Sequence, residues 1–426
     1  MDAYNSLSCH RDHLLEQYKG KPVSALPTPS FIVDMAVVRA NCRRMLDRLD
    51  DLHIGLTFRP HVKTHKTVEI SKLELGNGEK HNSIVASTIR ELQGVLPLVA
   101  TGVVKDALYG VPPAKSKISI LEGIARQMVA YNAKLRLMID SIDQLNMLKD
   151  YSTKNPGIPA WSIFLKVDIG DHRAGQEATS ATFDSLVKEI ITTTDKYVEL
   201  HGVYVHRGSS YGSAGVYDAQ AHLKLEVEGV KAAASVVRKY SSSRYVLSMG
   251  ATPTAHIVSS EVKSWMKDLQ TYGEVEIHAG NYALLDIQQV ATGLVSPSDI
   301  AGKVVAEVLS YYADRDEYLI DAGVLALARE PGRIPGIAIV EGQPMSGSRW
   351  VLNRVSQEHG ILGRRTDAVD GFMSADSIES VDPKWEIGDK IVLLPQHACI
   401  TSSMYQWYFA VENGVVDEIL LPWRGW

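Results

Sequence analysis

Between residues 29 and 292, short apolar runs rich in β-branched side chains alternate with longer stretches of helical period. This alternation predicts parallel strands joined by crossover helices. The predicted helices include residues 35–49 and 219–239, with Asp34 and Asp218 as their N-caps. The predicted strands include residues 30–33, 54–58, 83–86, 135–139, 162–167, 202–205, 245–247 and 274–277. So many repeated units favour a closed barrel over an open sheet.

The positions of the polar clusters support a barrel. Nearly every apolar run ends in a polar or glycine-rich cluster, at residues 59–66, 168–175, 206–211, 248–254 and 278–282. In a (β/α)8 barrel the loops at the carboxyl ends of the strands open on one face, where catalytic groups gather. We therefore predict an α/β fold with a (β/α)8 TIM-type barrel.

The pattern changes after about residue 296. Short alternating strands without long helices between them follow, at residues 302–306, 318–320, 350–352 and 390–394, and they predict a mainly-β domain. We expect a leader over residues 1–24 that packs on either part, a barrel over 25–296 and a C-terminal β domain over 297–426. Asp286 is expected to start a structural helix.

Lys63 follows the apolar run 54–58, and we place it at the mouth of the second barrel strand. A lysine is most often a solvated surface charge. Here His61, His65 and Lys66 surround it with groups that can be cationic. They disfavour another positive charge and so favour the neutral amine that forms a Schiff base.

Two glycine-containing loops supply what a phosphate ester requires. Small residues let backbone N–H groups approach the anion, and hydroxyls add donors. Either loop alone is more often a plain turn, but two at successive strand ends after a reactive lysine are better explained by one phosphate. The loop residues concerned are Ser248, Gly250, Thr252, Gly280, Asn281 and Tyr282.

His397 and Cys399 follow the predicted strand 390–394. In an extended segment, residues i and i+2 project to the same side, so an imidazole and a thiolate can reach one point. That pair suits zinc, and two protein ligands leave coordination open for water and substrate, as in a catalytic site. Taken alone the pair is weak evidence, because a buried cysteine beside a packed histidine is far commoner.

The segment Pro60-His61-Val62-Lys63-Thr64-His65-Lys66 resembles the lysine motif of fold-type III pyridoxal enzymes, in the branch of eukaryotic D-serine dehydratases and D-threonine aldolases. The resemblance continues in order through residues 166–175, 202–206, 248–254 and 278–282. It implies a barrel followed by a β domain, and pyridoxal 5'-phosphate bound through Lys63 with its phosphate on the two glycine loops.

The resemblance also implies that Arg173, Tyr204 and His206 face the cofactor ring, with Arg173 near its phenolic oxygen. Arg173 or His206 could instead be a structural ion-pair or hydrogen-bond partner. In similar D-serine dehydratases a histidine and a cysteine hold zinc in this C-terminal place, whereas D-threonine aldolases have an aspartate where this chain has Cys399. A thiolate selects zinc, while a carboxylate suits manganese and other harder ions.

The resemblance therefore implies a D-serine ammonia-lyase that uses pyridoxal phosphate and zinc for α,β-elimination to pyruvate and ammonia. D-threonine is a further expected substrate, and D-serine detoxification is the expected role. The nearest alternative is a D-threonine aldolase. An alternative of another class is a non-catalytic pyridoxal phosphate carrier, but such carriers lack the β domain.

A formal net charge of -6 gives no electrostatic reason to expect a nucleic acid or an anionic membrane as partner. The first 22 residues hold no apolar stretch before a cleavage site, and no long apolar run follows. We therefore expect a cytoplasmic protein that acts on a small molecule. Related enzymes are dimers with shared active sites, so the resemblance implies a homodimer.

Overall fold

The computed structural model describes residues 2–193, 196–372 and 384–426. They form two compact units, and each is described by itself. One unit contains residues 43–211, 216–280 and 425–426, and the other contains residues 1–42, 212–215 and 281–424. No helix in the described ranges is both long enough and apolar enough to cross a membrane.

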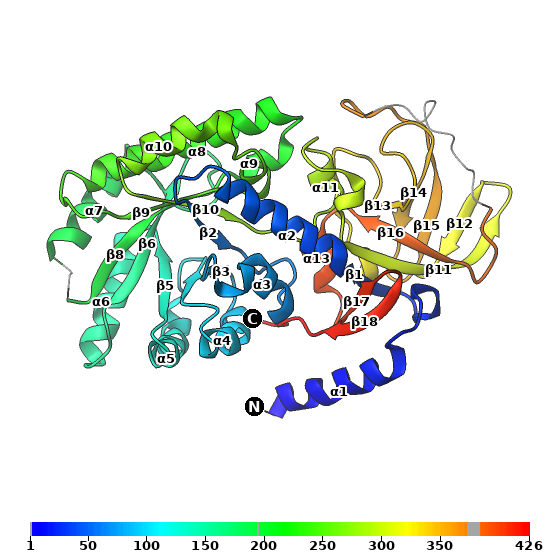
Figure 1. Cartoon of the computed structure of the whole chain (residues 1–426), viewed down its shortest axis with the longest axis horizontal. Coiled ribbons are helices and arrows are strands. Elements are labelled where there is room, and N and C mark those ends of the chain that lie inside the picture. Colours follow the sequence, from blue (N-terminus) through cyan, green and yellow to red (C-terminus); the bar gives the residue numbers. More distant parts are fainter. Residues whose placement is uncertain (1, 194–195, 373–383) are drawn as a thin grey trace. The chain divides into compact units, whose positions relative to one another are not determined.

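The first unit is a barrel of parallel strands surrounded by helices (Figure 1). A parallel bridge between His61 and Val85 joins the first and last strands of the sheet and closes the ring. The predicted (β/α)8 architecture is therefore confirmed. In sheet order the strands are β2 (Thr57–Pro60), β10 (Glu274–Ala279), β9 (Val246–Met249), β8 (Val198–Val205), β6 (Trp161–Asp168), β5 (Lys134–Ile139), β4 (Asp106–Tyr109) and β3 (Ser83–Ala86), with the short β7 (Gln176–Glu177) beside β6.

Side-chain caps mark where several barrel helices begin. The hydroxyl oxygens of Thr88 and Ser141 accept backbone N–H groups at the starts of α4 and α6. Helix α8 begins at Val216, so Asp218 lies in its first turn and is not the predicted cap. The helices are α3 (Val68–Glu74), α4 (Ile89–Ala100), α5 (Ile118–Val129), α6 (Ile142–Lys154), α7 (Ala181–Thr193), α8 (Val216–Val237), α9 (Thr252–His256) and α10 (Lys263–Gln270).

The second unit is built on a mainly antiparallel sheet. Its strand β1 pairs antiparallel with β11 and parallel with β17. The assignment of residues 30–33 to the barrel is therefore wrong, and Lys63 follows the first barrel strand, not the second. In sheet order the strands are β12 (Glu317–Ile320), β15 (Gly360–Arg365), β14 (Arg349–Val355), β13 (Ala338–Val340), β16 (Lys390–Pro395), β11 (Gly302–Tyr312), β1 (Ser30–Asp34), β17 (Tyr408–Glu412) and β18 (Val415–Leu420).

Two helices near the N-terminus flank β1. Helix α1 (Asp2–Tyr18) packs on β18, where Arg11 Nε donates to the carbonyl of Ile419 at 3.2 Å. Helix α2 (Met35–Asp50) is capped as predicted, because Asp34 Oδ1 accepts the N–H groups of Ala36 and Val37 at 3.1 and 3.2 Å. The described part of the leader thus belongs with the antiparallel sheet.

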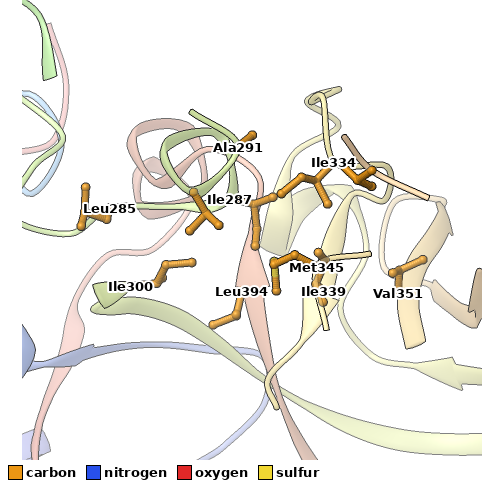
Figure 2. Packing of buried hydrophobic residues seen from close by; sticks show 11 residues of the cluster. Leu285, Ile287, Ala291, Ile300, Ile334, Ile339, Met345, Val351 and Leu394 are labelled. Carbon is orange, nitrogen blue, oxygen red and sulfur yellow. The ribbon is translucent and has the colours of Figure 1, made fainter. Parts of the chain in front are cut away.

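A buried apolar cluster supports the end of β16. Ile287 and Leu394 are fully buried in it with side chains from β13 and β14 (Figure 2). Asp286 Oδ1 accepts the N–H of Gln289 at 2.9 Å, so Asp286 caps α11 (Ile287–Val290) as predicted. Two further short helices are α12 (Val324–Leu327) and α13 (Ala398–Ser403).

Candidate active site

The barrel holds a cavity of about 290 Å³, to which the carboxyl ends of all eight barrel strands contribute. This is close to the lower end of the usual size of a small-molecule site, roughly 300 Å³. Of the predicted site residues, those that line it are Lys63, Arg173, Tyr204, His206, Thr252 and Gly280. The lining also includes His61, Ser87, Lys166, Asp168, Asp171 and His278, which the sequence analysis did not assign to the site.

Lys63 lies in a turn directly after β2. The N–H of Lys66 donates to the carbonyl of Val62 at 2.8 Å and closes this turn, while the N–H of Lys63 donates to Nδ1 of His61 at 3.3 Å. A Cβ at Gly280 would lie 3.5 Å from Cε of Lys63. An added Cβ would therefore touch the lysine side chain at an ordinary van der Waals distance, which places Gly280 directly beside Lys63.

His65 and Lys66, two of the expected cationic neighbours of Lys63, each pair with a buried carboxylate. Nε2 of His65 lies 3.1 Å from the buried carboxylate of Glu74, and the ammonium of Lys66 pairs with the buried carboxylate of Glu91. Each group has an anionic partner that is distant in sequence. Both residues therefore hold the turn in place.

Burial and nearby cations keep two cavity histidines neutral. Burial, Lys166 and Lys63 lower the pKa of His206 to about 3. Its Nδ1 donates to the carbonyl of Gly250 at 2.8 Å, which leaves Nε2 as an acceptor. Burial and Lys63 likewise hold the pKa of His61 well below its ordinary value, and its Nε2 lies 2.9 Å from the Ser87 hydroxyl.

Aromatic stacking forms one wall of the cavity. The rings of Tyr204 and His278 stack with their centroids 4.0 Å apart and 6° between their planes. The Ser248 hydroxyl is buried and lies 3.0 Å from Nδ1 of His278. Ser248 is not among the residues that line the cavity, and the assignment of its hydroxyl to a phosphate stays a prediction.

Three other predicted phosphate residues, Gly250, Asn281 and Tyr282, are also not among the lining residues, and their assignment to a phosphate stays a prediction. Gly250 has φ +144°, and a Cβ there would be 2.3 Å from the carbonyl oxygen of His278, so glycine is needed for close strand packing. Asn281 and Tyr282 fall in the unit with the antiparallel sheet, where the Asn281 amide donates to Asp286. The cavity itself presents Ala251, Thr252 and Gly280.

Lys166 is one of the cavity residues that the sequence analysis did not assign to the site. It is buried within β6, and burial and Arg173 lower its pKa to about 8. Its Nζ lies 5.3 Å from the centroid of the Tyr204 ring. A lysine inside a fully apolar run is rare unless its ammonium has a partner, and this signal could have revealed it.

The cavity has the chemistry that pyridoxal phosphate requires. Lys63 offers an amine, and Lys63, Lys166 and Arg173 outnumber the two lining carboxylates, which favours a dianionic phosphate ester. Nε2 of His278 is buried without a hydrogen-bond partner among the described residues. The residues present therefore fit the cofactor.

His397 and Cys399 approach each other in the second unit, but not on an extended segment as predicted. The strand ends at Pro395, His397 is the N-cap of α13, and Cys399 is the second residue of that helix. Burial lowers the pKa of His397, but the hydrogen bond and charge of Cys399 outweigh burial and raise it to about 9. A metal cation would take the place of the shared proton. Within the described ranges no cluster of three or more His, Cys, Asp or Glu side chains could hold a metal.

Two family models match the chain. The alanine racemase N-terminal domain matches residues 33–266, and the putative serine dehydratase domain matches residues 301–411. The D-serine dehydratase of Schizosaccharomyces pombe is 38% identical over 99% of this chain and 97% of its own length. The D-serine dehydratase of Saccharomyces cerevisiae is 35% identical over 97% of this chain and 99% of its own.

Solved structures of D-threo-3-hydroxyaspartate dehydratase share the fold. A histidine-to-alanine mutant superposes with a TM-score of 0.80 at 28% identity and covers 97% of this chain and 99% of its own. A cysteine-to-alanine mutant in the metal-free form has a TM-score of 0.77 at 27% identity and covers 95% and 100%.

Proposed function

The chain belongs to the D-serine dehydratase family, and we propose that it uses pyridoxal phosphate to convert D-serine to pyruvate and ammonia by α,β-elimination. One observation carries the chemistry: Lys63 lines a cavity at the carboxyl ends of the barrel strands together with Arg173 and His206. An amine, a guanidinium and a neutral imidazole are the groups needed to bind an aldehyde-bearing phosphate ester and to move one proton.

The residues of the cavity have different roles in the proposed reaction. Bound pyridoxal phosphate supplies an electron sink for the charge left on the substrate α-carbon. Lys63 would hold the cofactor through its Nζ, and the same amine would serve as the base for the α-proton of the substrate. His206 stays neutral, because its pKa of about 3 lies far below the working pH, so it accepts a hydrogen bond without adding positive charge.

We assign a zinc ion to His397 and Cys399. Two points support this: the two side chains interact, and a thiolate prefers zinc to harder ions. In addition, a solved structure of a related dehydratase with a cysteine replaced by alanine is of its metal-free form. Zinc supplies a Lewis acid for the departing hydroxyl, and it can lower the pKa of a bound water from about 15.7 towards about 7.

Product analysis tests the proposal. Purified protein with pyridoxal phosphate should release pyruvate and ammonia in equal amounts from D-serine, and metal analysis should find about one zinc per chain. A chelator should abolish turnover, and added zinc should restore it. Glycine and acetaldehyde from D-threonine would identify an aldolase instead. Bound cofactor with neither activity would identify a carrier.

We further propose a cytoplasmic homodimer with shared active sites that removes D-serine. Light scattering coupled to size-exclusion chromatography should give twice the mass of one chain. Mixing two inactive variants, with substitutions in different parts of the shared site, should restore part of the activity. A monomeric mass with full activity would contradict shared sites.

A further inference from the structure

Glu330 faces the candidate metal ligand His397. Its Oε2 lies 3.7 Å from Nδ1 of His397, and both side chains are only partly exposed. Nδ1 makes no hydrogen bond within the described ranges. The 3.7 Å separation is roughly 0.5 Å longer than a hydrogen bond of this kind. If Nδ1 points at Glu330, Nε2 is the nitrogen left to bind a metal.

The loop that carries Glu330 is fastened to the residue before His397. The Gln396 amide donates to the carbonyls of Ile334 and Gly336, both at 2.6 Å. The backbone of Gly332 lies against the same side chain, since a Cβ there would overlap Gln396 Oε1 at 2.1 Å. Two direct bonds thus fasten the segment that follows Glu330 to the residue before His397.

Asp286 holds the backbone between the two candidate ligands, His397 and Cys399. Asp286 Oδ2 accepts the N–H of Ala398 at 2.8 Å, and this buried carboxylate also caps α11. The turn from His397 to Cys399 is therefore held by the protein whether or not a metal is bound. What the backbone does not set is the orientation of the imidazole ring and the tautomer.

We infer that Glu330 is the positioning residue that sets the orientation and the tautomer of the His397 ring. A carboxylate that accepts Nδ1–H places the proton on that nitrogen, keeps the lone pair on Nε2 and raises the basicity of the ring towards a metal. This inference rests on the proposed zinc site and adds a residue to it. Glu330 acts through His397 and does not itself bind the metal.

Zinc affinity of the purified full chain, measured by competition with a chromogenic chelator, tests the inference. Glu330→Leu removes the acceptor and should weaken zinc binding by about 10- to 100-fold. Glu330→Gln keeps an uncharged acceptor and should recover part of the loss. The matched control is Glu341→Leu, which removes another partly exposed carboxylate from the same unit and should leave zinc affinity unchanged.

Replacing zinc with cobalt(II) shows whether Glu330 orients His397 or binds the metal itself. At saturating cobalt, Glu330→Leu should keep the thiolate charge-transfer and ligand-field bands of the wild type. Changed bands would make Glu330 a ligand and overturn the assignment. Equal zinc affinity of the wild type and Glu330→Leu would overturn the inference and leave the zinc proposal standing. A wild type that binds no zinc would overturn both.

Discussion

Two lysines face the barrel cavity, and their positions give them different chemistry. Lys63 lies in a turn beyond the end of β2, next to Gly280. Lys166 is buried within β6 over the Tyr204 ring, and its lowered pKa of about 8 also makes it a candidate nucleophile. Their roles therefore need a direct test.

Replacing each lysine should distinguish them. Lys63→Ala should lose the visible absorption band of the imine with pyridoxal phosphate and lower kcat by at least roughly 1000-fold, since it removes both the covalent anchor and the base. Lys166→Met should keep the band. Absorption spectra report the imine band, and borohydride trapping followed by peptide mass analysis identifies the lysine that forms the imine. A band that persists in Lys63→Ala and disappears in Lys166→Met would contradict the assignment.

The buried histidines should make the protein sensitive to acid. His206 has a pKa of about 3 in the fold and an ordinary value of about 6.5 when unfolded. Between these values only the unfolded state binds the proton, so stability rises with pH up to about 6.5 and falls as the pH drops below it. From pH 6.5 to pH 5 this residue alone should cost on the order of 2 kcal/mol.

Urea unfolding of the cofactor-free protein at pH 5 and pH 7 measures this effect. His206→Gln keeps an amide that can donate to the Gly250 carbonyl but cannot be protonated. The variant should therefore lose less stability than the wild type between the two pH values. The same loss in both proteins would show that His206 is not the cause.

At the scale of elements, the turn from β9 into α9 depends on one glycine. Gly250 combines φ +144° with a backbone so close to β10 that a Cβ would lie 2.3 Å from the carbonyl oxygen of His278. That same strand carries His278 against Tyr204. A side chain at Gly250 would thus separate two strands that shape the cavity.

Gly250→Ala should therefore destabilise the barrel by roughly 1–3 kcal/mol or more, because conformational strain and overlap add. Gly123 is the matched control, since it lies in α5 and a Cβ added there would meet nothing within 4 Å. Gly123→Ala should be neutral or stabilise by up to about 1 kcal/mol. Thermal unfolding of the three proteins gives the comparison, and equal losses in both variants would contradict it.

At the scale of the whole molecule, a buried ionic network joins barrel strands that are far apart in sequence. Asp106 of β4 accepts hydrogen bonds from Arg59 of β2 at 2.6 Å and from Arg136 of β5 at 2.8 Å. Arg59 also donates to Glu276 of β10 at 2.8 Å. The two arginines lower the pKa of Asp106 to about 2 despite its burial. The barrel interior is thus held partly by charge pairs.

Breaking this network should be costly. Asp106→Asn leaves the Arg59 guanidinium buried with one anionic partner fewer, which should lower the free energy of unfolding by about 3–5 kcal/mol. Asp150→Asn on the exposed face of α6 is the control and should change stability by less than about 0.5 kcal/mol. Chemical denaturation measures both. Equally small changes in the free energy of unfolding of the two variants would show that the network contributes little to stability.

Local sequence was enough to predict the barrel, the position of Lys63 after a strand and the meeting of His397 with Cys399. Strand and helix periods are local, and the carboxyl ends of parallel strands share one face whatever the register. The identity of the cofactor and of the metal was inferred from the resemblance to a known family, not from residue spacing. Local pattern also missed β4.

Tertiary structure decided which partner each group meets. Strand β1 looks like a barrel strand in sequence but pairs with β11 and β17, which lie hundreds of residues further along the chain. The hydroxyl of Ser248 bonds to His278, and Lys66 pairs with Glu91. Strand pairing and side-chain burial depend on residues that are distant in sequence. The composition and period around one position therefore determine whether a helix or a strand forms there, but not which other elements it packs against.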